Sequence, residues 1–229
     1  MTTFLTAAAT RRWDIYGPVH KGLRLGHMDL MVRLGRAGFD GPEAELLADL
    51  AAHLAHARLH IAHEESVIHP ALEARAAGAC AALEAQHQHH RDTVAALAAA
   101  IEAVQAAGPQ ERPALGRALY LAFSAFVAED LEHMRQEETA TWPLLCAHFT
   151  DEELAGLEMS IISTLTPEEN IAFMRLMLPA MSAAERAGLL GGMKAGAPPE
   201  AYGAVIELAA RATLSAGDMA ELERLGLAA

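Results

Sequence analysis

The chain has 229 residues, 52% of them hydrophobic and only 5% aromatic, with a formal net charge of −13. Alanine and leucine dominate and β-branched runs are rare, so the composition favours an all-α protein. The negative charge argues against nucleic acid and anionic membrane surfaces as partners. No segment approaches the roughly 18 uninterrupted apolar residues of a membrane-spanning helix, and the N-terminal segment does not read as a signal peptide. The isolated Cys80 and Cys146 predict two free thiols in a reducing cytoplasm.

Helix signals divide the first two thirds of the chain into long segments. Residues 1–18 are expected to form an irregular arm, and Pro18 is a good first-turn residue for the helix that follows. Glycines and prolines mark the later breaks, at Gly35, Gly38, Gly41, Pro42, Gly78, Gly108 and Pro109. The expected helices cover residues 18–34, 43–69, 80–107 and 113–142. Long helices joined by short turns predict an up-down-up-down four-helix bundle, and we assign it residues 1–149.

Residues 150–229 have a different pattern. Helix-start signals recur there at short intervals, at Thr150, Thr166, Ser182, Pro198 and Ser215. We therefore expect a C-terminal region of roughly four or five short helices. The region contains no histidine and no motif that assigns it a chemical role, and it is a candidate surface for a protein partner.

One pattern, H-x-x-x-E-E-x-x-x-x-P-x-L, occurs twice, over residues 60–72 and 133–145. Residues four apart lie on one face of a helix, so each copy aims an imidazole and a carboxylate in the same direction. The proline is expected to end each helix. Two such helices facing each other would supply two histidines and two glutamates to one interior space. This repeat predicts a metal site, and most simply a two-metal site.

The apolar faces of the expected helices turn several of the twelve histidines inward. The inward-facing candidates are His20, His27, His60, Glu64, His87, His90, His133 and Glu137. Asp130 also points inward, where a buried carboxylate needs a partner, and we expect it to hydrogen-bond a ligand histidine. His53 shares the inward sector and His89 points outward, while His63 is either solvated or an outer contact of the site. For Glu65, Glu138 and Tyr16, both a role at the site and ordinary surface or packing roles stay open.

These residues, over about 14–149, resemble the hemerythrin-like (HHE cation-binding) domains, which are four-helix bundles holding a carboxylate-bridged di-iron centre. The resemblance implies metal ligands at His20, His60, Glu64, His87, His133 and Glu137. There are two departures from the oxygen-carrying hemerythrins. Their H-x-x-x-H in the third helix is interrupted here by Arg91, which leaves His90 as the available seventh ligand. Their aspartate in the fourth helix is replaced by Glu137 or Glu138.

The resemblance implies two carboxylate-bridged iron ions, and manganese or zinc would also suit these ligands. The expected function is binding of O₂, NO or peroxide at an open metal position, as a store, sensor or scavenger. Two alternatives stay open: a di-iron oxidase, peroxidase or NO reductase, and an iron-sensing regulatory protein. Whether the protein is an enzyme is therefore undecided at this point. A metal-free helical interaction module, in which His60 and His133 are dispensable, is the simplest competing interpretation.

Overall fold

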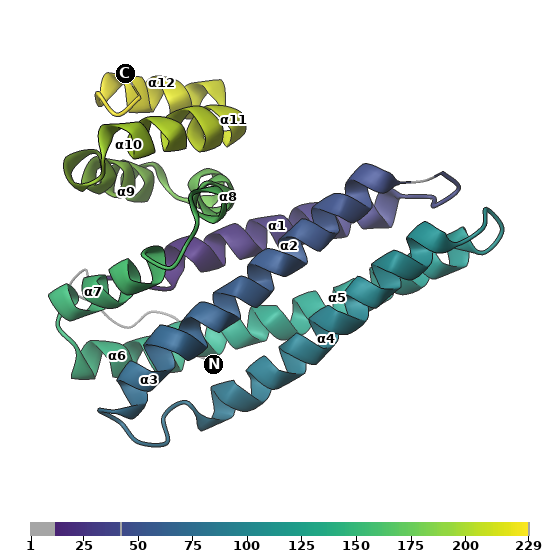
Figure 1. Ribbon diagram of the computed structural model, residues 1–229, viewed down its shortest axis with the longest axis horizontal. Helices are drawn as coiled ribbons and strands as arrows, with labels where there is room; N and C mark the ends of the chain where they lie inside the picture. The colour runs from purple at the N-terminus through teal and green to yellow at the C-terminus, as the bar shows by residue number, and fades with distance from the viewer. Residues whose placement is uncertain (1–11, 42, 229) are drawn as a thin grey trace, which may run out of the picture.

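The computed structural model describes residues 12–41 and 43–228. The beginning of the expected N-terminal arm, residues 1–11, and the break at Pro42 lie outside the described residues. Most of the described chain is helical, and none of it forms a strand, which confirms the all-helical class (Figure 1). Both cysteines fall in the described part, and neither takes part in a disulfide.

Four long helices precede residue 137: α1 (Gly17–Arg36), α2 (Ala44–His63), α4 (Ala81–Ala106) and α5 (Arg112–Gln136). Each packs against two of the others, in the cyclic order α1, α2, α4, α5 (Figure 1). Their apolar faces meet in a shared core that includes Leu50, Leu97, Leu119, Phe123 and Phe126. Burial of these faces is the main force holding the four helices together, because an isolated helix gains little stability from its own propensity.

The two copies of the repeated motif continue beyond the expected helix ends. α2 passes through a π-helical segment, η1 (Glu64–Ile68), into α3 (His69–Glu73). α5 passes in the same way through η2 (Glu137–Thr141) into α6 (Trp142–His148). The expectation that the prolines end the helices is therefore wrong.

The reason is the wide π turn that precedes each proline. The backbone N–H of His69 bonds the carbonyl of Glu64, five residues back, and Trp142 bonds Glu137 in the same way. Pro70 and Pro143 then occupy the first turn of a new α-helical segment. A proline is tolerated there, because its missing N–H has no obligatory partner in that turn.

The expected short helices are present after residue 150: α7 (Asp151–Ile162), α8 (Pro167–Met177), α9 (Ala183–Gly196), α10 (Pro199–Val205), α11 (Arg211–Thr213) and α12 (Ala216–Arg224), with a 3₁₀ turn η3 (Leu178–Ala180) and a π segment η4 (Ile206–Ala210). Thr150, Thr166 and Ser182 form capping boxes with the glutamates three residues on. The region has its own apolar cluster, which includes Leu178 and Leu190.

This C-terminal region packs against the long helices through α8 and η3, which contact α1, and α8 crosses α1 at a steep angle (Figure 1). The approach is closest at Gly22, where an added Cβ would lie 2.9 Å from Leu176 Cγ and 3.0 Å from the Leu176 backbone. An ion pair of 2.5 Å joins Lys21 of α1 to Glu185 of α9. In the described residues no helix is both long and apolar enough to cross a membrane.

Candidate metal centre

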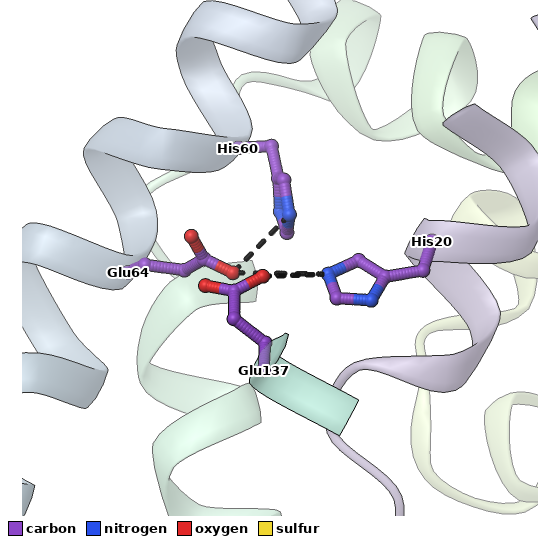
Figure 2. A group of neighbouring side chains, drawn as sticks. All are labelled: His20, His60, Glu64 and Glu137. Carbon is purple, nitrogen blue, oxygen red and sulfur yellow. Dashed lines mark ion pairs between the residues drawn. The ribbon is translucent and has the colours of Figure 1, made fainter. Parts of the chain in front are cut away.

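Six buried side chains from the four long helices and their π extensions converge at one place in the interior. They form two overlapping groups, one of His20, His60, Glu64 and Glu137, and one of Glu64, His87, His133 and Glu137. Within each group, one ligand atom per residue lies within 4.8 Å of every other (Figure 2). Glu64 and Glu137 belong to both groups.

Each of the two shared carboxylates turns one oxygen toward the first group and its other oxygen toward the second group. Glu64 Oε1 lies 3.2 Å from His60 Nε2, and its Oε2 lies 3.3 Å from His87 Nε2. Glu137 Oε2 lies 3.3 Å from His20 Nε2, and its Oε1 lies 3.3 Å from His133 Nε2. This is the disposition that a carboxylate bridging two cations requires.

Most of the atoms that face the centre have no hydrogen-bond partners; the exceptions are His87 Nε2 and His133 Nε2, which lie 3.0 Å apart and hydrogen-bond each other. Both oxygens of Glu64 and of Glu137 are orphaned, and so are the Nε2 atoms of His20 and His60. A buried polar group without a partner costs about 1–3 kcal/mol, and a charged one costs more. Imidazole nitrogens and carboxylate oxygens are together the donors that divalent transition metals accept. The residues present therefore fit a bound metal, which would satisfy all of these atoms at once.

The local helix geometry explains why the repeated spacing delivers its ligands. Glu64 N–H bonds the His60 carbonyl, and Glu137 N–H bonds the His133 carbonyl, so the H-x-x-x-E step is α-helical in both copies. The π segments begin at these same glutamates. Such single π turns inside α-helices are common at functional sites, because they re-aim the side chains that follow.

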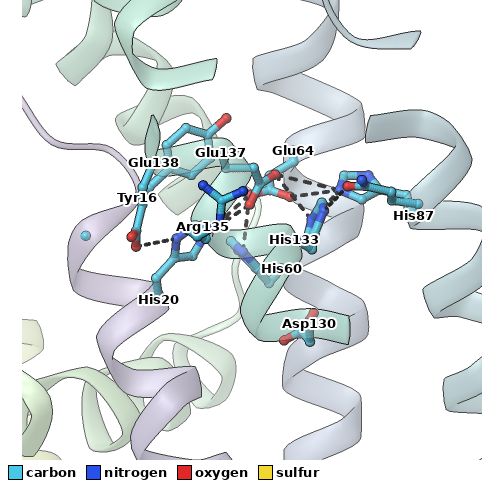
Figure 3. Close-up of polar contacts among 12 residues, drawn as sticks. Tyr16, His20, His60, Glu64, His87, Asp130, His133, Arg135, Glu137 and Glu138 are labelled. Atoms are coloured by element: carbon cyan, nitrogen blue, oxygen red, sulfur yellow. Dashed lines mark hydrogen bonds and ion pairs between the residues drawn. The ribbon is translucent and has the colours of Figure 1, made fainter. Parts of the chain in front are cut away.

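Side chains outside the centre hold the far ring nitrogens of two candidate ligands. His20 Nδ1 donates to Glu138 Oε1 over 2.9 Å (Figure 3). Arg24 Nη1 donates to the same carboxylate oxygen over 2.6 Å. His133 Nδ1 donates to Gln86 Oε1 over 2.8 Å. A proton kept on Nδ1 leaves the Nε2 lone pair free to face the centre. Glu138 thus contacts a candidate ligand directly. The contact of Gln86 was not predicted, because a glutamine carries no distinctive sequence signal.

On the opposite side of the centre, His87 Nδ1 lies near a carboxylate but makes no hydrogen bond. Its Nδ1 lies 3.3 Å from Glu65 Oε1, and Glu65 forms an ion pair with Arg91. Arg91, which interrupts the third-helix histidine pair, therefore supports a neighbour of the centre. The ring of His69 stacks on His87 with centroids 5.0 Å apart, and both of its nitrogens lack partners. His69 lies within the repeated motif, but it was not among the side chains predicted to face the site.

His90 is buried but belongs to neither group. Its ring lies edge-on to His133, and its Nδ1 is 3.4 Å from Asp130 Oδ1. Asp130 also accepts a hydrogen bond of 2.8 Å from His27 Nε2, and His27 Nδ1 accepts one of 2.9 Å from His53 Nε2. A row of buried polar side chains thus leads away from the centre along the core. The role of His90 as a seventh ligand stays a prediction.

In the metal-free protein, two of the candidate ligand histidines bind protons more tightly than an ordinary histidine does. A metal ion would have to compete with these protons. Burial lowers the pKa of His87, but the carboxylates of Glu137 and Glu64 outweigh it and raise the pKa to about 9. Burial also lowers the pKa of His20, yet the nearby carboxylates of Glu137 and Glu138 raise it well above its usual value. Positive charge is thus favoured at this point, and protons supply it where a metal does not.

Tyr16 is fully buried next to the centre. Its ring stacks on His20 with centroids 5.1 Å apart, and its hydroxyl has no hydrogen-bond partner. Burial, followed by the charges of Glu137 and Glu64, raises its pKa well above the usual value. Without a metal, Tyr16 is therefore held as the neutral phenol. His63 belongs to neither group of candidate ligands, and its ring lies 6.1 Å from that of Phe173.

A scan against protein-family models found no match. Searches of curated proteins and of solved structures found no match either. The class of the protein is therefore taken from its own fold and from the residues of the candidate site. It is an all-helical protein with buried histidine and glutamate groups that could bind metal, an arrangement compatible with a hemerythrin-like fold.

Proposed function

We propose that this chain is a non-haem di-iron protein of the hemerythrin-like class, with its four long helices forming a four-helix bundle around a carboxylate-bridged metal pair. The observation that supports this most is the position of Glu64 and Glu137. Each glutamate is shared by both groups of candidate ligands. One oxygen of each faces the first group and the other oxygen faces the second group. Two carboxylates without partners in a dry interior would repel each other unless cations lay between them.

The residues divide between holding and supporting roles. His20 and His60 would hold one ion, His87 and His133 the other, and the two glutamates would bridge them. Mixed imidazole and carboxylate ligands suit iron, and manganese or zinc are the other candidates. When bound, an iron pair supplies two-electron chemistry toward O₂, NO or peroxide. The apolar Phe126 and Met134, both fully buried, keep bulk water away from the ligands.

On this proposal the protein binds a diatomic molecule or peroxide as a store, sensor or scavenger. The two free cysteines fit a reducing compartment such as the cytoplasm. A second candidate function, a di-iron oxidase, peroxidase or NO reductase, is favoured by one observation. A largely apolar cavity reaches Glu64 and His60 and is larger than a diatomic ligand needs. Turnover with an added electron donor separates the two candidates.

The first experiment is metal analysis of the purified protein, with absorption spectra of the reduced form before and after O₂ is added. We expect two iron ions per chain and a new visible absorption band. His87→Ala should lower the metal content, whereas His89→Ala, on the exposed side of the same helix, should leave it unchanged. Substoichiometric metal, with no loss of helix on chelation, would contradict the proposal.

A further inference from the structure

A cavity lies between the candidate metal centre and the C-terminal region. Its volume, counted as the space open to the centre of a water molecule, is about 100 Å³. On the same measure, a single water needs only about 10–15 Å³. Val19 of α1 and Ile68 of η1 line its inner side. Ile162 of α7, Phe173 and Met177 of α8 line its outer side. The wall that closes this cavity is therefore contributed by residues beyond 150.

The inner end of the cavity is formed by Tyr16, His60 and Glu64. The Tyr16 hydroxyl, His60 Nε2 and both Glu64 oxygens are buried and lack hydrogen-bond partners. The cavity thus ends on unsatisfied polar atoms of the candidate metal centre. A molecule inside it would lie directly beside the ligand set. The rest of its surface would meet mainly apolar side chains, together with His63, Glu158 and Asn170.

The charges in the lining select among the molecules that fit. Glu64 places a carboxylate at the inner end of the cavity, and Glu158 places another among the outer residues. Among the described residues, no lysine or arginine lines the cavity. The chain as a whole carries a net charge of −13. In the metal-free protein, an anionic ligand would therefore meet these carboxylates and would find no lysine or arginine to compensate its charge.

We propose that this cavity binds an uncharged, apolar organic molecule of about the size of one aromatic ring or a short alkyl chain. The scale follows from a dry apolar cavity on the order of 150 Å³, which takes up benzene or xenon. The C-terminal region then has a defined role, because it completes the binding site. That the bound molecule is a substrate of the metal centre rests on the proposed function, whereas the binding itself does not.

The test is fluorobenzene binding to the full-length protein, followed by ¹⁹F NMR, with 4-fluorobenzoate as the charged comparison. We expect saturable binding of fluorobenzene and none of 4-fluorobenzoate. Ile162→Trp places a larger side chain in the cavity and should weaken binding at least tenfold. Met159→Trp is the matched control, because Met159 is on the same helix, is 59% exposed and does not line the cavity.

Circular dichroism checks that each variant is folded, and Leu165→Trp, also at the cavity wall, replaces Ile162→Trp if that variant is not. The inference is overturned if fluorobenzene does not saturate, if the folded cavity variant binds as well as the control, or if 4-fluorobenzoate binds equally. Metal analysis of the same samples keeps the two proposals apart. Two ions per chain without fluorobenzene binding refutes only the cavity inference, while fluorobenzene binding by a chain that takes up no metal refutes only the proposed function.

Discussion

Glu64 and Glu137 occupy equivalent positions in the two copies of the repeated motif and meet in the buried interior, where each belongs to both candidate metal groups (Figure 2). Burial raises the pKa of Glu64, but His60, His20 and His87 outweigh it and hold the pKa well below its usual value. The pKa of Glu137 is lowered as well, so both glutamates are placed to be ionised although they are buried. Positive charge from a cation, or from protons on the imidazoles, has to compensate them.

Glu64→Gln should reduce the metal content of the protein to one ion per chain or fewer. The substitution keeps the shape of the side chain but removes the charge that both groups share. The measurement is the metal-to-protein ratio after dialysis against a weak chelator. Glu129→Gln is the matched control, since Glu129 is exposed and contacts the exposed His89. Full metal content in Glu64→Gln would show that Glu64 is not a bridging ligand.

Glu138→Ala should weaken metal binding by about 10–100-fold without unfolding the protein. Glu138 is half-buried, and it accepts a hydrogen bond from His20 Nδ1 and pairs with Arg24. Its loss frees the His20 ring to rotate and removes the acceptor that keeps the proton on Nδ1. Chelator competition measures the affinity, and Glu132→Ala, which removes an exposed glutamate of α5, is the comparison. Equal affinities in the two variants would rule out this orienting role.

Metal affinity should rise with pH up to about pH 9. The pKa of His87 in the metal-free protein is raised to about 9, so below that value the metal must displace its proton. The expected slope is about tenfold per pH unit for each displaced proton. Chelator competition between pH 6 and 9 tests this, and a pH-independent affinity would contradict it.

The raised pKa of His87 makes the metal-free protein less stable as the pH rises, although metal affinity increases over the same range. A folded-state pKa of about 9 for His87, against 6.5 for an ordinary histidine, favours the protonated folded form. This stabilisation is fully present below pH 6.5 and is lost as the pH rises through 9. The free energy of unfolding of the metal-free protein, measured in urea, should therefore fall between pH 6.5 and about 9. His87→Ala should reduce this fall.

Gly22→Ala should destabilise the protein by about 1–3 kcal/mol, the usual cost of overpacking. The added Cβ would lie 3.0 Å from the backbone of Leu176, so α8 would have to move away from α1. Gly188→Ala in α9 is the control, because nothing lies within 4 Å of its Cβ position. There the change should stabilise the helix by about 0.5–1 kcal/mol. Urea unfolding measures both variants, and equal effects would argue against close α1–α8 packing.

Much of the helical structure was predictable from local patterns. Alanine-rich and leucine-rich segments bounded by glycine and proline predicted α1, α2, α4 and α5 to within a few residues, apart from the continuation past Pro70 and Pro143. That error has a physical cause, because a π turn depends on hydrogen bonds five residues apart and on packing around the glutamates. A proline is consistent with either outcome, so the local sequence did not distinguish them.

By itself, the sequence determined which side chains share a helix face, since the four-residue spacing of His60 and Glu64, and of His133 and Glu137, follows directly from helix geometry. Only the tertiary structure decided which faces meet. It brought His20 and His87 to opposite sides of the shared carboxylates, left His90 outside both groups, and placed the C-terminal region against α1. Those outcomes depend on contacts between residues far apart in the chain, which the spacing within a single helix does not specify.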